Sequence, residues 1–212
     1  MTPPRAGGIV PAMTFASRMI RCPIVFDPAP AADIRASFSD LLPELAQLLA
    51  ATAGCSPYLK GLMDRESVWL REALSLGPET AADAALAALD DLPLDGLSDG
   101  LRQAKRRLAL LTALADLGGV WPLETVTGTL TALADRAVDL SMKRLVADEI
   151  RRGKLPGQTA DDVATAGGMV TLAMGKMGAG ELNYSSDIDL ICLFDQDRYG
   201  DDAAEARTAF IR

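Results

Sequence analysis

The stretch that decides the fold runs over residues 175–190 and reads GKMGAGELNYSSDIDL. It follows an apolar run at residues 169–173 that is bounded by glycines and predicts a buried strand. It leads into a second apolar run, so residues 187–194 predict another strand. A glycine-rich loop at residues 175–180 and a short turn at 181–183 join the two strands. This order predicts a sheet-containing domain, to which we assign residues 156–212.

Two acidic residues open the second predicted strand. Because side chains alternate along a strand, Asp187 and Asp189 should project from one face, with their Cα atoms about 6.6 Å apart. Neighbouring carboxylates repel each other unless divalent cations neutralise them, and a pair of metal ions can hold the attacking and leaving oxygens of a phosphoryl or nucleotidyl transfer. A lone Asp-x-Asp is more often an exposed strand end, but here it adjoins an apolar run that we expect to be buried. We therefore predict that Asp187 and Asp189 are catalytic metal ligands.

The loop before these aspartates supplies candidate phosphate-binding groups. Glycines allow backbone N–H groups to approach a phosphate closely, although neither a P-loop nor a dinucleotide-binding glycine motif is present. The candidates are Lys176, Gly178, Ala179, Gly180, Ser185 and Ser186. Hydrogen bonding within a turn is an equally good interpretation for the two serines, and a solvated charge is one for the lysine.

The chain upstream of this domain has the pattern of packed helices. Apolar residues recur at helical spacing over residues 33–53, 67–76, 81–89, 101–117 and 124–150. The first stretch predicts one helix or a kinked pair, because Pro43 is tolerated only at a break or in a first turn. Ser56 followed by Pro57 predicts a helix N-cap. Residues 1–32 predict an irregular lead-in, residues 90–99 an acidic linker, and residues 161–168 a polar loop. The expected fold is α+β, with a mostly helical region at 33–155 followed by the beginning of a mixed sheet.

The most regular of these helices carries a cluster of basic residues: Arg102, Lys105, Arg106 and Arg107. Such a cluster is usually a solvated helix face with local ion pairs. A phosphate or an acidic partner is the alternative. The sequence favours the solvated face, because nothing else in it points to nucleic-acid binding.

Composition excludes several classes of function. The 212 residues contain no histidine, which removes Ser-His-Asp triads, Cys-His dyads and the usual catalytic zinc sites. Three scattered cysteines form no disulfide framework and indicate a reducing compartment. A net charge of −8 argues against a surface for nucleic acid or an anionic membrane, and no apolar run is long enough to span a bilayer.

The quoted stretch closely resembles the signature of the bacterial glutamine synthetase adenylyltransferase/adenylyl-removing enzymes. These belong to the DNA-polymerase-β-like nucleotidyltransferases. Residues 56–59, the basic helix at 101–117 and residues 115–121 also look like the helical N-terminal region of that family, so the resemblance covers about residues 35–197.

The resemblance implies a long enzyme with two nucleotidyltransferase domains. The first would remove AMP from a glutamine synthetase tyrosine with orthophosphate, releasing ADP, and the second would attach AMP from ATP. It also implies Mg²⁺ on Asp187 and Asp189, control by a PII signalling protein and glutamine, and a cytoplasmic location. With one Asp-x-Asp near its end, the chain is expected to be an N-terminal fragment of the enzyme that ends inside the removing domain, lacks a third carboxylate and is inactive alone.

Two other functions remain open at this point. The chain could belong to another polymerase-β-like nucleotidyltransferase, such as a PII uridylyltransferase. It could instead be a non-catalytic helical module that docks onto glutamine synthetase.

Overall fold

The computed structural model describes residues 14–211 and is mostly helical. Its helices are α1 (Phe15–Arg18), α2 (Pro28–Ser37), α3 (Pro43–Cys55), α4 (Pro57–Arg65), α5 (Ser67–Ser75), α6 (Pro78–Ala87), α7 (Leu94–Leu117), α8 (Leu123–Arg151), α9 (Gly175–Gly178) and α10 (Ala203–Phe210), with 3₁₀ segments η1 (Ala160–Gly168) and η2 (Asp197–Asp202). Strands β1 (Met169–Ala173) and β2 (Leu190–Phe194) complete the fold. The mostly helical α+β class is therefore confirmed.

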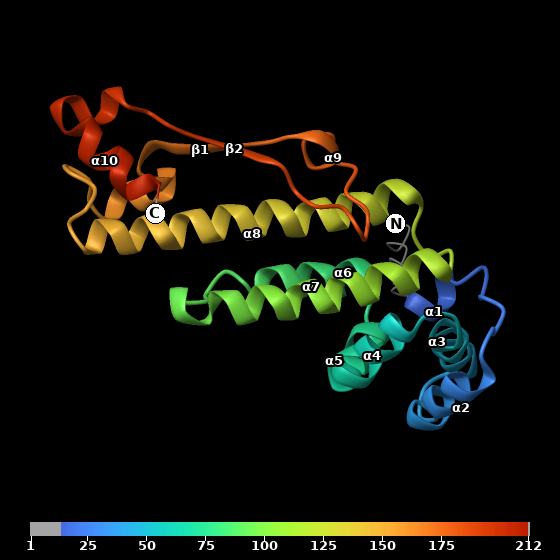
Figure 1. Ribbon diagram of the computed structural model, residues 1–212. Helices are drawn as coiled ribbons and strands as arrows, with labels where there is room; N and C mark the ends of the chain where they lie inside the picture. Colours follow the sequence, from blue (N-terminus) through green and yellow to red (C-terminus); the bar gives the residue numbers. More distant parts are fainter. Residues whose placement is uncertain (1–13, 212) are drawn as a thin grey trace, which may run out of the picture.

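Helices α7 and α8 form a long antiparallel pair at the centre of the molecule (Figure 1). Short helices α2–α5 pack at one end of this pair, while β1 and β2 run along α8 (Figure 1). One large core joins α2–α8 through fully buried side chains such as Leu48, Leu70, Leu108 and Leu111. Among the helices of residues 14–211, none contains an apolar stretch that could span a lipid bilayer.

Local sequence signals explain where the short helices begin. Pro43 occupies the first turn of α3, so residues 33–53 belong to two helices, α2 and α3, which settles the alternative that the sequence left open. The Ser56 hydroxyl caps α4 by accepting a hydrogen bond of 3.2 Å from the Leu59 N–H.

The predicted lead-in at residues 1–32 is wrong where the structure describes it. Phe15 in α1 is fully buried, and α2 already begins at Pro28. The Arg18 guanidinium binds the Glu79 carboxylate at 2.7 Å and the Val120 carbonyl oxygen at 3.0 Å, which fastens this segment to the helical core. Residues 1–13 of the predicted lead-in lie outside the described residues.

Two predicted loops also contain helical turns. The acidic linker at residues 90–99 is shorter than expected, because α7 begins at Leu94 and Leu97 joins the core. The predicted polar loop at residues 161–168 forms η1, where Thr159 and Asp162 make a capping box.

The strands form a two-stranded antiparallel sheet, in which Met169 pairs with Phe194 and Ala173 pairs with Leu190. Strand β1 has the predicted bounds, whereas β2 begins three residues later than predicted. In the described chain this sheet has no parallel strand, so the predicted mixed sheet is not seen. A second, smaller core lies at the far end of α8, where the rings of Phe194, Tyr199 and Phe210 pack together.

Candidate functional site

The loop that carries the candidate site is fixed to α8. Leu182 is buried, and its N–H donates a 3.2 Å hydrogen bond to the hydroxyl oxygen of Thr131. The Thr131 hydroxyl donates in turn to the Thr127 carbonyl oxygen at 2.9 Å. This chain of hydrogen bonds connects residues far apart in the sequence and holds the start of the loop in place.

Asn183 organises the turn that follows. Its side-chain oxygen accepts hydrogen bonds from the Ser185 N–H at 3.1 Å and from the hydroxyls of Ser185 and Ser186 at 3.3 and 2.8 Å. The Asn183 N–H donates to the Ser186 hydroxyl at 3.3 Å. Both serines therefore have the turn role that the sequence left open, and Asn183 is the residue that our sequence reasoning missed. The pattern Asn-x-Ser-Ser, typical of side-chain-stabilised turns, could have pointed to it.

Asp187 and Asp189 lie on an extended segment just before β2, and both are exposed. The prediction that they sit at the edge of a buried strand is wrong: β2 starts at Leu190, and its middle residues are exposed. The backbone nevertheless continues the pairing by one step, because the Met174 N–H donates to the Asp189 carbonyl oxygen at 2.9 Å.

The two aspartates share one side of this segment. Ser186 and Ile188 line a cavity against α7 and α8, so alternation along the extended backbone directs Asp187 and Asp189 away from the helices. Neither carboxylate forms an ion pair with any residue from 14 to 211. Two adjacent, unpaired carboxylates are thus presented to the solvent.

This donor set fits a hard divalent cation in chemical type, because Mg²⁺ prefers carboxylate oxygens and keeps several waters. The number of protein ligands is small, because the described residues contain no group of three or more acidic or cysteine side chains that could hold a metal. The pair could therefore supply two ligands, with water and substrate oxygens as the others.

The glycines before the turn are required by the backbone conformation and by close packing. A Cβ added at Gly178 would lie 2.4 Å from the Ala173 carbonyl oxygen, so no larger residue fits there. Gly175 and Gly180 have φ angles of +55° and +75°, in the region that favours glycine. The first four residues of the predicted loop form the single turn α9.

Lys176 and Ala179 are exposed near this turn. Lys176 makes no ion pair within the described part of the chain. Contact of either residue, or of the glycines, with a phosphate stays a prediction.

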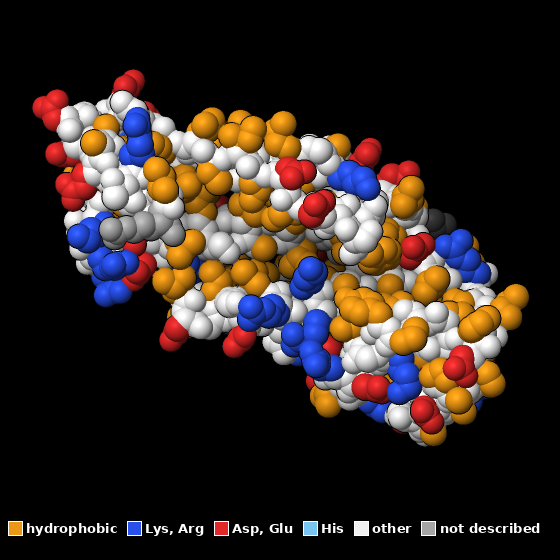
Figure 2. Space-filling model, viewed as in Figure 1, with side chains coloured by type: hydrophobic (Ala, Val, Ile, Leu, Met, Phe, Trp, Pro, Cys, Tyr) orange, Lys and Arg blue, Asp and Glu red, His pale blue; other side chains and the backbone are white. Residues whose placement is uncertain are grey.

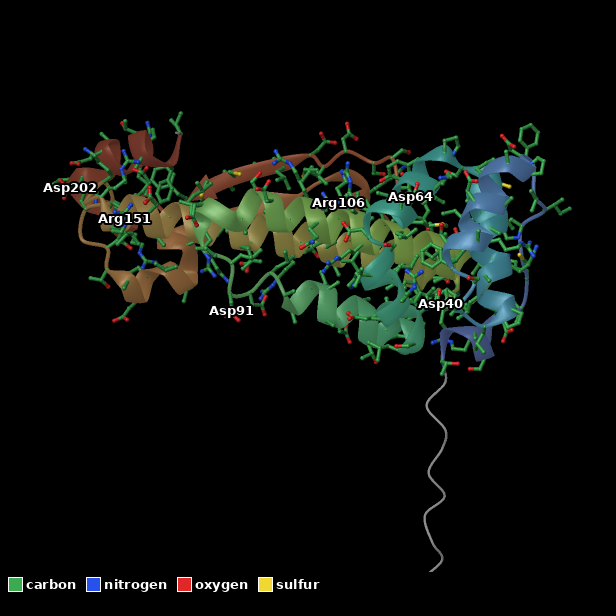
Figure 3. All side chains as sticks on the ribbon, turned by 90° about the horizontal axis from the view of Figure 1, so that it is seen from below. Asp40, Asp64, Asp91, Arg106, Arg151 and Asp202 are labelled. Carbon is green, nitrogen blue, oxygen red and sulfur yellow. The ribbon has the colours of Figure 1, made fainter. Side chains whose placement is uncertain are left out.

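The basic cluster on α7 divides into two pairs. Arg106 and Arg107 each donate a 2.9 Å hydrogen bond to the buried carboxylate of Glu66, and Figure 3 shows Arg106 where α7 meets the short helices. Burial alone would raise the pKa of Glu66, but the hydrogen bonds and charges of the two arginines outweigh it and lower that pKa. Arg102 and Lys105 are exposed and line the same cavity as Ser186. The predicted solvated face thus describes one pair, whereas the other is a structural ion cluster.

Comparison with known proteins identifies relatives over most of the chain. The family model described as glutamate-ammonia ligase adenylyltransferase matches residues 45–212. A protein of Bradyrhizobium sp. (strain BTAi1 / ATCC BAA-1182) is 41% identical over 174 residues, which is 80% of this chain and 18% of that protein. A protein of Caulobacter vibrioides is 41% identical over 145 residues, 66% of this chain and 15% of that protein.

Both relatives carry the name bifunctional glutamine synthetase adenylyltransferase/adenylyl-removing enzyme. The chain spans less than a fifth of the length of these relatives. No solved structure matches it significantly.

Proposed function

The chain belongs to the glutamate-ammonia ligase adenylyltransferase family, and from this premise we propose that it carries the metal-binding carboxylates of an adenylyl-removing site. The substrate would be glutamine synthetase that bears AMP on a tyrosine. The observation that carries the proposal is the pair Asp187 and Asp189, both exposed and unpaired on the outer side of a loop fixed to α8.

The proposed reaction is a phosphorolysis. The bond between the tyrosine oxygen and the phosphorus of AMP breaks, and an orthophosphate oxygen forms a new bond to that phosphorus, giving ADP. The proton that the tyrosine oxygen gains balances the one that the attacking phosphate loses.

Asp187 and Asp189 would hold Mg²⁺, which when bound supplies charge neutralisation to the phosphate oxygens. The loop geometry does the positioning. Asn183 holds the turn through hydrogen bonds with Ser185 and Ser186, and Leu182 fixes its start to Thr131. These contacts position the segment that carries the two carboxylates, although Asp187 and Asp189 lie outside β2.

A chimeric enzyme tests this proposal. The matching region of the Bradyrhizobium relative would be replaced by the aligned residues of this chain, and both AMP removal and AMP attachment would be measured on glutamine synthetase. We expect the chimera to retain both activities. Asp187→Asn or Asp189→Asn should then lower phosphate-dependent ADP release at least about 100-fold, because a metal ligand of the transition state is lost, and leave attachment within about twofold.

Asp195→Asn is the matched control, because it removes one exposed carboxylate just after β2 and should leave both activities unchanged. Removal that persists in the Asp187 and Asp189 variants would contradict the site assignment. Loss of attachment with removal intact would assign the pair to the attaching domain instead.

Further roles of the whole enzyme follow from the same proposal. ATP would be the AMP donor for the attaching domain, while a PII signalling protein and glutamine would set the balance between the two activities. The site of action would be the cytoplasm.

A further inference from the structure

A cavity of about 390 Å³ lies between α7, α8 and the inner side of the loop at residues 182–188. Its floor consists of apolar side chains at helical spacing on α8, including Leu130, Leu133 and Ala134. The small side chains of Ala109, Ala134 and Ala137 also line the cavity and leave space between α7 and α8. This volume falls within the range typical of small-molecule sites.

Charge at the cavity has a single sign. Arg102 and Lys105 line it, and no aspartate or glutamate does, although the chain has 29 acidic residues and a net charge of −8. Lys105 has no ion-pair partner within residues 14–211, and Arg102 reaches only the exposed Asp99 at 3.3 Å. Figure 2 shows basic side chains gathered over the middle of α7, beside the hydrophobic side chains of the hollow. Such a mouth attracts an anion.

The remaining polar lining suits a ligand with an aromatic body. Tyr58 from α4 and Tyr184 from the loop both line the cavity, and their side chains are 62% and 48% exposed. Exposed phenol rings can stack on a planar base. The hydroxyl of each phenol can also donate a hydrogen bond to the ligand. Asn183 and Ser186 add polar atoms at the same rim.

This cavity is distinct from the acidic pair. Ser186 and Ile188 contribute to its wall, whereas Asp187 and Asp189 lie on the other side of the same backbone and line none of the described cavities. A molecule bound in this cavity would contact the loop that carries the carboxylates. The loop backbone would lie between this molecule and the two carboxylates.

We propose that this cavity binds a nucleoside phosphate, with the phosphates on Arg102 and Lys105 and the base against the tyrosines over the apolar floor. Binding in this cavity does not require the proposed adenylyl-removing chemistry. It would couple to the acidic loop through Asn183 and Ser186, which belong both to the cavity rim and to the turn that positions Asp187.

Calorimetric titration of the 212-residue chain with ADP in the presence of EDTA tests the proposal, because binding that needs a metal on the acidic pair is then absent. We expect saturable binding of one ADP. Adenosine and orthophosphate should each bind at least about tenfold more weakly, since each lacks one half of the ligand. Orthophosphate binding as tightly as ADP, or no saturable ADP binding at millimolar concentration, would overturn the proposal.

Variants locate the binding. Arg102→Ala with Lys105→Ala should weaken ADP binding at least about tenfold. Arg65→Ala with Lys154→Ala removes the same charge from two exposed residues outside the cavity and should leave ADP binding unchanged. Equal effects of the two double variants would overturn the proposal.

Two further variants separate the cavity from the acidic pair. Ala134→Trp fills the floor and should abolish ADP binding while the helical circular dichroism spectrum stays the same. Asp187→Asn should bind ADP in EDTA as the original chain does, and this result would hold even if the acidic pair had no catalytic role. Loss of metal-free ADP binding in Asp187→Asn would place the nucleotide on the acidic side and contradict the cavity assignment.

Discussion

The helical region and the two-stranded sheet differ in how far their apolar side chains are buried. In α3, α5 and α7, leucines such as Leu48, Leu70 and Leu111 are fully buried in one continuous core. On the outer face of the sheet, Val170 and Leu193 are 53% and 54% exposed. The helices thus bury their own apolar surface, whereas the sheet leaves a face that nothing within residues 14–211 covers.

The inner face of the sheet is also incompletely packed. A groove of about 600 Å³ remains between β1, β2 and α8, lined by side chains such as Met142, Leu145 and Leu190. Isolated two-stranded sheets are marginal in water. We infer that the helices supply the stability of the chain, whereas the sheet and the loop before β2 contribute little to it and carry the candidate site.

Truncation of a leucine should show the largest difference in stability between the two regions. Leu111→Ala leaves a cavity in the core and should lower the free energy of unfolding by about 2–5 kcal/mol. Leu193→Ala, the matched change on the sheet, should alter it by less than about 0.5 kcal/mol. Urea denaturation followed by circular dichroism at 222 nm measures both. Similar losses in the two variants would show that the sheet is part of the same packed core.

The ion cluster in the helical region should give the next largest effect. Glu66→Gln leaves Arg106 and Arg107 without a carboxylate and should cost about 2–3 kcal/mol, less than for a fully buried pair because both arginines are about a quarter exposed. Glu79→Gln is the control, since the Glu79 side chain is 53% exposed and its pair with Arg18 should contribute under about 1 kcal/mol.

The Glu66 effect should depend on pH. The arginines hold the pKa of the folded Glu66 carboxyl below its ordinary value of 4.5, so its contribution is complete above that pH and is lost as the pH falls through the folded pKa. The stability difference between the original chain and Glu66→Gln should therefore shrink below about pH 4.5. Unfolding curves at a series of pH values measure it, and a difference that grows in acid would contradict the ion-cluster account.

A charge on the outer face of the sheet should have the smallest effect on stability. Leu193→Lys places an ammonium group on a surface that is already exposed, so unfolding should change by less than about 0.5 kcal/mol. Association should decrease, because an exposed apolar sheet face promotes aggregation and lysine opposes it. Light scattering at matched concentrations measures the association. A decrease of about 2 kcal/mol or more in the free energy of unfolding, measured by urea denaturation, would mean that the face is packed.

The helices were largely predictable because their signals are local. Helical spacing and the Ser56–Pro57 cap placed α3 and α4 well. The start of α7 was missed because Asp95 and Gly96 favour a turn, whereas burial of Leu97 in the core outweighs that preference. A tertiary contact of this kind leaves no mark in the local pattern.

The candidate site was predictable in its residues but less so in its geometry. Strand β1 has only five residues, so pairing ends where Ala173 meets Leu190, and the aspartates fall outside β2. The anchor between Leu182 and Thr131 joins residues 51 positions apart, and the cavity needs Lys105 beside Ser186. Such long-range contacts depend on helix packing, which the periodicity of one sequence does not specify.

The loop before β2, and not another acidic part of the surface, should bind a divalent cation. Titration of the ¹⁵N-labelled chain with Mn²⁺ tests it directly, because the paramagnetic ion broadens the amide signals near its site. We predict that the amides of residues 186–190 broaden first, that Asp187→Asn and Asp189→Asn abolish this selectivity, and that Mg²⁺ competes. Earlier broadening at Asp90–Asp91 or Asp201–Asp202, or equal broadening over the whole surface, would contradict the claim.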